Sequence, residues 1–440
     1  MTRPSIVRTS LLLLALQVVF RLGDAVLPLL LAAWFGRSHA TDVYYFSWAA
    51  FAFAGSVVFS AFQDSAVVPI LAEVKLLSPA LWSRVTGSLL AHTLVIGGLL
   101  SACIGIVALG VFAARYDTEE LALAARMVPL FCLFLVALSV KTFAVAVLNS
   151  AHRFVAHPVA GAAGIITTLV VIALLRDRAG VLAIPAAALA GELTAIGVLG
   201  YVAFYGMNMR ITLTLERPEP VRRFARLALS EVTGGALTRI NPIVDQLMAS
   251  WVGIVGAGTL LRYSSDVATI PTSLLQASLL PVLLSVLSDD FGAGNLAKAR
   301  ATVNRTLVSV CSILAAASLA LYLASAPILR FAFLRGQMDA AGVERMIELM
   351  PYHLVGVAPF GALLVLARAH VALKNSRIMV SMGLINACSN VLFDVVLLRP
   401  LGLKGVALST SLVHTVVAIV FYVRLESRLA REGLAVGVTA

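Results

Sequence analysis

The segment RINPIVDQLMASWVGIVGAGTLLRYSSDVATIPTSLLQASLLPVLLSVLSDD, residues 239–290, places ionisable side chains inside long apolar runs. These side chains are Arg239, Asp245, Arg262 and Asp266. A charge that faces lipid costs roughly several kcal/mol, so such residues face a partner, a water-filled cavity or a substrate path. The segment therefore predicts membrane helices that carry a functional site.

Prolines and glycines interrupt the same segment. Pro242, Pro271 and Pro281 remove helical hydrogen bonds, which membrane proteins tolerate where neighbouring helices or cavity water satisfy the freed carbonyls. Gly253 and Gly256 mark a turn, so we expect two apolar helices joined by a glycine-rich connection. Broken, charged helices of this kind indicate transport.

Similar apolar runs recur along all 440 residues, of which 60% are hydrophobic and 12% charged. This composition predicts an all-α polytopic membrane protein. We expect about twelve transmembrane helices, near residues 10–35, 43–72, 86–114, 125–148, 154–175, 181–205, 227–252, 257–288, 304–328, 349–372, 377–398 and 405–423.

The formal net charge of +11 reflects membrane topology rather than nucleic-acid binding, because the basic residues lie in short loops between the runs. Eighteen of the 33 Lys and Arg residues fall on the side of the predicted spans that holds the termini, and ten fall on the opposite side. The positive-inside rule then predicts a multi-pass protein of the bacterial inner membrane with both termini cytoplasmic.

The longest polar connection divides the spans into two sets of six. We expect an N-terminal lobe at 1–206, a cytoplasmic linker at 207–226, and a C-terminal lobe at 227–440 that ends in a short cytoplasmic tail. The lobes repeat weakly, since residues 33–47 align without gaps on 250–264. Six spans in each lobe give both copies the same orientation, which predicts pseudo-symmetric lobes around a central cavity.

Five segments in serial order carry a resemblance to the MurJ/MviN lipid flippases of the MOP exporter superfamily. They are WFGRSHATDVYYFSWAAF (34–51), FSAFQDSAVVPILAEVK (59–75), VLNSAHRFVAHPVAG (147–161), INPIVDQLMASWVG (240–253) and RYSSDVATIPTSLLQASLLPVLLSVLSD (262–289). The resemblance implies an exporter that moves an undecaprenyl-pyrophosphate-linked glycan across the inner membrane by alternating access.

The resemblance leaves the glycan open. The family's peptidoglycan-precursor flippases place arginines in a central cavity; Arg21 matches one of these positions, whereas the others carry Leu27, Gly55 and Val267. Some members also have fourteen spans, against the twelve predicted here. The glycan is either a lipid II-like peptidoglycan precursor or the repeat unit of another polysaccharide, with a glycan polymerase or glycosyltransferases as further partners.

Candidate substrate-binding residues of the cavity combine cations and carboxylates. Guanidinium groups bind pyrophosphate with two forked donors and a permanent charge, which favours a substrate role for the cations. Alternatively, pairs three or four residues apart neutralise each other within one helix. The candidates are Arg21 with Asp24, Arg262 with Asp266, and Arg239 and Asp64, which have no such neighbour.

Oxygen-bearing side chains indicate a second site. Asn390 and Asp394 are four residues apart on one helix face, and Asp245 and Thr410 are expected to converge with them. Such oxygen ligands suit a hard cation such as sodium, and the family resemblance adds the Val406 carbonyl. Protons on the same carboxylates are the alternative coupling ion, and a hydrogen-bonded helix contact is the structural alternative.

Two other functions stay open, namely a cation-coupled multidrug antiporter of the same superfamily and a transport-inactive scaffold of a glycan-assembly complex. No catalytic residue and no organic cofactor are expected. The sequence has no glycine-rich phosphate loop with lysine, no hydrolase-type histidine cluster and no soluble domain large enough for ATP.

Overall fold

The computed structural model describes residues 26–58, 67–207, 209, 211–225, 237, 239–373 and 376–438. Within these ranges the regular structure is helical and contains no strand. The chain divides into two compact units, Met1–Thr233 (unit 1) and Gly234–Ala440 (unit 2). The prediction of an all-helical polytopic membrane protein is confirmed.

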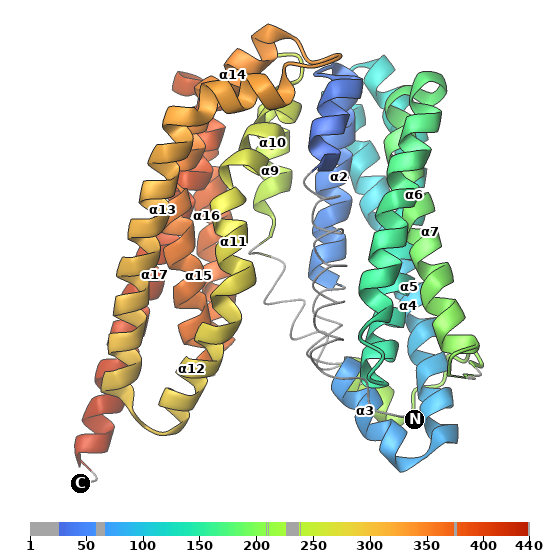
Figure 1. The fold of residues 1–440 in the computed structure, drawn as a ribbon, viewed down its shortest axis with the longest axis vertical. Coiled ribbons are helices and arrows are strands. Elements are labelled where there is room, and N and C mark those ends of the chain that lie inside the picture. Colours follow the sequence, from blue (N-terminus) through green and yellow to red (C-terminus); the bar gives the residue numbers. More distant parts are fainter. Residues whose placement is uncertain are drawn as a thin grey trace. The chain divides into compact units, whose positions relative to one another are not determined.

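Unit 1 contains long helices joined by short turns (Figure 1). A short helix, Val26–Phe35, comes first. The helices that follow it are α2 (His39–Val58), α3 (Val68–Leu77), α4 (Pro79–Arg115), α5 (Thr118–Ser150), α6 (Ala156–Ala179) and α7 (Ala183–Phe204), with the 3₁₀ turn η2 (Gly180–Leu182) between the last two. Asp117 caps α5 through the backbone amides of Glu119 and Glu120, an arrangement that fixes where this helix begins.

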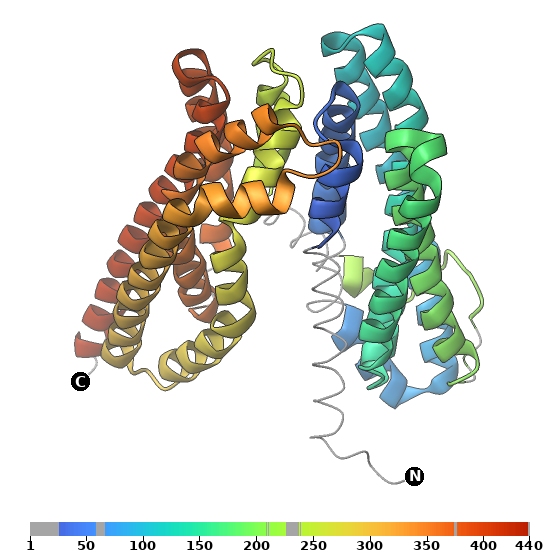
Figure 2. The same cartoon turned by 45° about the horizontal axis from the view of Figure 1, so that its top comes forward.

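Unit 2 contains shorter helices as well as long ones (Figures 1 and 2). They are α9 (Asn241–Ala249), α10 (Ala257–Ala268), α11 (Ile270–Ser278), α12 (Leu280–Gly292), α13 (Leu296–Phe333), α14 (Ala340–Leu354), α15 (Val357–Ala372), α16 (Ser376–Leu401) and α17 (Leu403–Val438). The prediction of only two helices in residues 239–290 is wrong, because the structure forms four there.

The extra breaks follow from the backbone chemistry that the sequence contains. Pro242, Pro271 and Pro281 each stand in the first turn of a helix, where a missing N–H leaves no bond unmade. Gly253 and Gly256 have positive φ angles of 72° and 78°, which residues with a Cβ rarely adopt. The prolines therefore start new helices rather than kinking continuous ones.

Six uninterrupted helical runs of the described residues are long and apolar enough to cross a membrane. A seventh is present if α14 and α15, which are bent by 44° at their junction, form one span. One of the six runs, Ala156–Phe204, contains the whole α6–α7 hairpin. Predicted spans 257–288 and 349–372 are thus built from several helices, and residues 10–25 of the first span lie outside the described residues.

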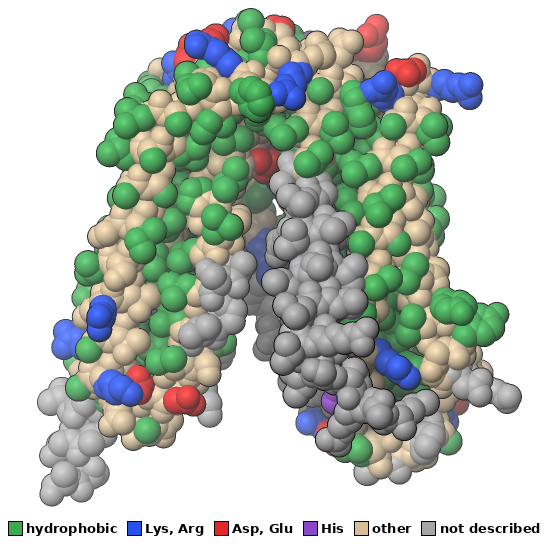
Figure 3. Space-filling model, in the orientation of Figure 1, with side chains coloured by type: hydrophobic (Ala, Val, Ile, Leu, Met, Phe, Trp, Pro, Cys, Tyr) green, Lys and Arg blue, Asp and Glu red, His purple; other side chains and the backbone are tan. Residues whose placement is uncertain are grey.

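The surface of the helices has the polarity of a membrane protein. On the face shown in Figure 3, hydrophobic side chains cover the flanks of the helices, and most charged side chains gather at the helix ends. Val308 and Leu323 on α13 are 69% and 72% exposed, and Leu174 on α6 is 71% exposed. Burial in lipid accounts for these exposed apolar side chains, which would be unfavourable in water.

The helices that pack most extensively on one another occupy corresponding places in the sequences of the two units. In unit 1, α4 packs on α5, α5 on α7, and α6 on α7. In unit 2, α13 packs on α14 and α15, these two pack on α17, and α16 packs on α17. The order of pairing therefore repeats along the chain, as expected for two pseudo-symmetric halves.

The described residues of segment 207–226 pack on unit 1. Met209, Val221 and Phe224 are buried in a core formed with α3, α4 and α5. Arg223 is ion-paired with Glu73 of α3 at 2.9 Å. The boundary between the units falls after this segment, at Thr233.

Candidate functional site

Three helices of unit 2 form the candidate site. α16 and α17 are antiparallel neighbours that turn at Gly402, whose φ of 57° favours glycine. Gly405 approaches the Leu397 backbone so closely that a Cβ there would clash with its carbonyl. α9 packs against both helices, so side chains from three separate parts of the chain meet.

Amides and a carboxylate connect α9 to α16 in two successive turns. Asn386 Nδ2 donates to Asn241 Oδ1 at 2.8 Å. One turn further along both helices, Asn390 Nδ2 donates to Asp245 Oδ1 at 3.0 Å. The four-residue spacing on each helix puts the two pairs on the same faces.

α17 completes the set of hydrogen bonds. Thr410 Oγ1 donates to Asp245 Oδ2 at 3.0 Å, so each oxygen of the Asp245 carboxylate accepts one bond. Ser409 Oγ donates to the Asn390 backbone carbonyl at 3.3 Å. The predicted meeting of Asp245, Asn390 and Thr410 is therefore present in the structure.

Asp394 lies one turn beyond Asn390 and is fully buried, with 0% of its surface exposed. Both of its carboxylate oxygens and the Asn390 Oδ1 atom have no hydrogen-bond partner among the described residues. The Ser409 hydroxyl lies beside Asp394 but donates to the Asn390 carbonyl. The site thus holds three buried oxygen acceptors without a donor.

Two carboxylates share this buried region, since Asp394 lies close enough to Asp245 to interact with it electrostatically. No Lys or Arg of the described residues is ion-paired with either one. An unpaired buried carboxylate is strongly unfavourable unless a proton or a cation neutralises it. The oxygen-only donor set fits a hard monovalent cation or a proton.

Val406 is also part of the predicted ligand set. It is fully buried in the first turn of α17. Its carbonyl oxygen faces the amide of residue 410 along the helix, and a carbonyl has a second lone pair available for a cation. The role of the Val406 carbonyl as a cation ligand stays a prediction.

The predicted substrate-binding residues have separate environments. Arg262 and Asp266 of α10 form an ion pair with 3.0 Å between Nε and Oδ1, and both side chains are partly exposed. Arg239 is exposed and directly precedes α9. Arg21, Asp24 and Asp64 lie outside the described residues.

The residue pattern of α16 contains one further signal of the site. Asn386, Asn390 and Asp394 are each four residues apart, so one face of this apolar helix carries three polar side chains. Asn386 and its partner Asn241 could have been found from this spacing and from the position of Asn241 beside Pro242. Ser409 gave no comparable signal, because its role depends on the hairpin geometry.

The helical two-unit fold defines this chain as a polytopic membrane protein, and Asp394 gives unit 2 a buried carboxylate. A protein-family model described as "Lipid II flippase MurJ" matches residues 31–438. The chain belongs to the MurJ lipid II flippase family.

Curated relatives support this assignment. A probable lipid II flippase MurJ of Rhizobium tropici is 25% identical over 320 residues, which cover 71% of this chain and 59% of the relative. The corresponding protein of Rhizobium meliloti (strain 1021) is 25% identical over 304 residues, which cover 67% of this chain and 56% of the relative. The chain thus spans little more than half the length of these relatives.

Solved structures share the fold. The lipid II flippase MurJ in an inward closed conformation has a TM-score of 0.76 at 19% identity, covering 96% of this chain and 90% of that chain. An inward-facing multidrug resistance MATE family transporter of the MOP superfamily has a TM-score of 0.78 at 14% identity, covering 95% of both chains. At these identities the likeness establishes the fold alone.

Proposed function

We propose that this protein is a flippase that moves an undecaprenyl-pyrophosphate-linked glycan across the bacterial inner membrane by alternating access. The observation that carries the proposal is the family match over residues 31–438. The paired helical units and their apolar flanks support it, because a flippase holds its substrate's lipid tail in the bilayer while the polar head crosses.

The substrate is a lipid-linked saccharide, either a lipid II-like precursor or a polysaccharide repeat unit. Controlled depletion of the protein tests this directly. An impermeant label then shows on which face of the membrane each extracted lipid-linked saccharide lay. We expect one saccharide to accumulate on the cytoplasmic face. An unchanged distribution of every lipid-linked saccharide would contradict flipping and favour a scaffold role.

We further propose that the site of Asp245, Asn390, Asp394 and Thr410 couples transport to a cation, with sodium as the first candidate and a proton as the second. The three unpartnered oxygens of Asn390 and Asp394 support a ligand there. A bound cation would supply positive charge that neutralises the two carboxylates. Asp245 on α9 and Asp394 on α16 would then attract one charge from two helices rather than repel each other.

α9 gives this site a route to the substrate path. Arg239 lies two residues before the first residue of α9, and Asp245 lies within this helix, so a change in how α9 packs on α16 would also move Arg239. A ligand shifts an equilibrium between two conformations only through its different affinity for them. Cation occupancy and glycan binding would be linked in this way through α9.

Purified protein offers a direct test of the coupling ion. We expect sodium to raise the melting temperature above that in potassium at equal ionic strength, because a ligand that binds only the folded state stabilises it. Equal melting temperatures in the two salts from pH 5 to 8 would rule out sodium as the coupling ion. A melting temperature that changes with pH in the same way in both salts would leave the proton as the coupling ion.

Orientation also belongs to this proposal. With both termini in the cytoplasm, a cysteine that replaces Leu215 should resist an impermeant thiol reagent in intact cells, and one that replaces Thr118 should react. Leu215 is 62% exposed, so burial would not protect it. The opposite labelling pattern would reverse the topology.

A multidrug antiporter of the same superfamily is the second candidate. A MATE family transporter of the MOP superfamily has the same fold, with a TM-score of 0.78, so the fold alone is compatible with both functions. Susceptibility to cationic dyes separates the two functions. A deletion strain that becomes dye-sensitive with unchanged lipid-linked saccharides would support the antiporter and contradict the flippase.

A further inference from the structure

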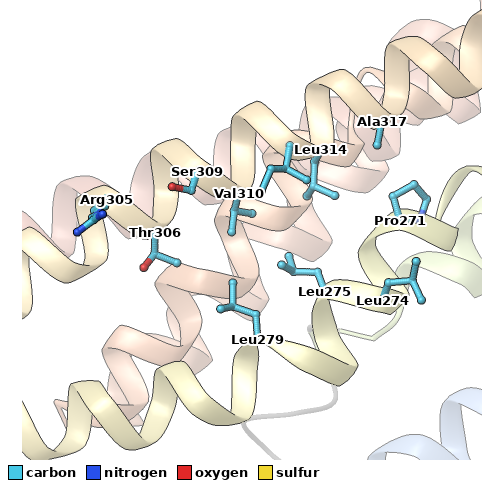
Figure 4. Close-up of a pocket in the computed structure, with 11 residues that line it drawn as sticks. Pro271, Leu274, Leu275, Leu279, Arg305, Thr306, Ser309, Val310, Leu314 and Ala317 are labelled. Atoms are coloured by element: carbon cyan, nitrogen blue, oxygen red, sulfur yellow. The ribbon is translucent and has the colours of Figure 1, made fainter.

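A groove of about 560 Å³ lies in unit 2 between α13 and α11, with Leu279 at the end of α11 also in its lining (Figure 4). Val310 and Leu314 form its buried floor. Leu274 and Ile313, which are 67% and 66% exposed, stand at its rim. All lining residues belong to unit 2, so the groove is complete within one compact part of the chain.

The two ends of the groove differ in polarity. Arg305, Thr306 and Ser309 line one end, and from Val310 to Ala317 the lining is apolar. The distance along α13 from residue 305 to residue 317 is about 18 Å, at 1.5 Å per residue. This is close to half of the hydrocarbon core of a bilayer, which is about 30 Å thick. The groove therefore has the length and polarity of one leaflet.

Arg305 differs from the other cations near the start of α13. Lys298 pairs with Asp290 at 2.7 Å, and Arg300 pairs with Glu426. Arg305 is exposed and forms no ion pair with the described residues. A guanidinium at the membrane surface without a carboxylate partner is suited to a phosphate, which it binds through two parallel N–H bonds.

The hydroxyl groups beside Arg305 are also available. Thr167 and Thr194 in unit 1 donate to the backbone carbonyl four residues earlier, as helical threonines often do. Thr306 and Ser309 form no hydrogen bond with any described residue. Together with Arg305 they provide one positive charge and two hydroxyl donors at the polar end of an apolar channel.

We propose that this groove binds one anionic phospholipid of the bilayer, with its phosphate at Arg305, Thr306 and Ser309 and one acyl chain between Leu275 and Leu314. A single guanidinium matches the single charge of a phosphodiester. Basic pockets between membrane helices bind lipid headgroups by the same combination of charge and apolar contact. The site is independent of the substrate that the protein transports.

Native mass spectrometry of the full chain in detergent tests the headgroup. We expect phosphatidylglycerol to bind about tenfold more tightly than phosphatidylcholine with the same acyl chains, because the choline ammonium of phosphatidylcholine neutralises its phosphodiester and repels Arg305. Arg305→Gln should remove the preference and Arg305→Lys should keep part of it. Arg300→Gln, which loses the same charge from the same helix, should leave the preference intact.

A second pair of variants tests the apolar end. Ala317→Phe fills the groove and should weaken the binding of both phospholipids. Ala316→Phe places the same ring at an exposed position outside the lining and should leave the binding of both unchanged. Equal binding of the two lipids, or equal effects of Arg300→Gln and Arg305→Gln, would overturn the proposal. Displacement of phosphatidylglycerol by an equal concentration of polyprenyl phosphate would also overturn it, by assigning the groove to a carrier lipid.

Discussion

The α6–α7 hairpin of unit 1 and the α16–α17 hairpin of unit 2 hold the same place in the two halves, yet their interiors differ chemically. In α6–α7, Gly164 and Gly191 let the backbones approach closely. Thr168 Oγ1 lies 3.0 Å from the Gly164 carbonyl and 3.3 Å from the Ala187 carbonyl, so its hydroxyl is satisfied. In α16–α17, Asp394 is fully buried and its carboxylate oxygens have no hydrogen-bond partner among the described residues.

The difference shows that the repeated fold does not itself create the acidic site. Both hairpins turn at a glycine with positive φ, Gly180 and Gly402. Small residues are enough to pack the first pair, as in many membrane helix pairs. The second pair carries buried charge that packing does not need, so a ligand or a proton is the physical reason for its presence.

Unit 1 has its own pair of partly buried charges, and the two neutralise each other. Lys141 of α5 and Glu192 of α7 lie 2.7 Å apart, with side chains that are 23% and 15% exposed. Lys141→Met should therefore lower the free energy of unfolding by roughly 3 kcal/mol, because it leaves Glu192 without its partner. Denaturant unfolding of the purified protein measures this loss.

The double variant Lys141→Met, Glu192→Leu is the control. It removes both charges and should recover most of the lost stability, since an apolar pair of similar volume replaces the ion pair. A double variant as unstable as the single one would assign Lys141 a role beyond neutralising Glu192.

In unit 2 the corresponding test removes a charge that has no protein partner. Asp394→Asn should fold, and it should lose the stabilisation by sodium, which amounts to about 2.7 kcal/mol when sodium is present at 100 times its Kd. Transport should fall with it. Asp290→Asn is the matched control, because Asp290 is 5% exposed and already paired with Lys298. Loss of the sodium response in both variants would contradict a specific site at Asp394.

The close backbone contact between α6 and α7 predicts that adding a side chain there lowers the free energy of unfolding by about 2 kcal/mol. A Cβ on Gly191 would clash with the Thr168 hydroxyl and the Gly164 carbonyl, so Gly191→Ala should destabilise unit 1 by overpacking. Gly197 lies on the same helix and has open space around it. Gly197→Ala should therefore stabilise by up to about 1 kcal/mol through helix propensity. Changes of the same sign in the two variants would contradict the close packing.

The smallest effect on stability is expected at α10. Arg262→Gln breaks an ion pair between residues four apart, which is worth about 0.3–0.5 kcal/mol. If Arg262 also holds pyrophosphate, transport should fall by about tenfold or more without a matching loss of stability, and Arg262→Lys should restore only part of it. Normal transport by both variants would leave the ion pair as the residue's only role.

The sequence by itself determined the features that depend on neighbours along the chain. Apolar runs long enough to span a bilayer predicted the helices, and the four-residue spacing of Arg262 and Asp266 predicted their ion pair. The same holds for Asn390 and Asp394, which share one face of α16. The prolines were also visible as helix breaks, but the number of helices was underestimated, because Pro271 and Pro281 each stand in the first turn of a separate helix.

Only the tertiary structure decided which distant residues meet. Asp245 and Thr410 are separated by 165 positions, and Lys141 and Glu192 by 51, so no helical periodicity relates them. Family resemblance suggested the first meeting, and nothing in the sequence distinguished a lobe-internal Lys141–Glu192 pair from substrate contacts. Helical patterns define which face of a helix is apolar, whereas side-chain packing between helices selects the partners. Packing between helices also leaves the Asp394 oxygens without a donor, because the Ser409 hydroxyl of α17 donates to the Asn390 carbonyl instead.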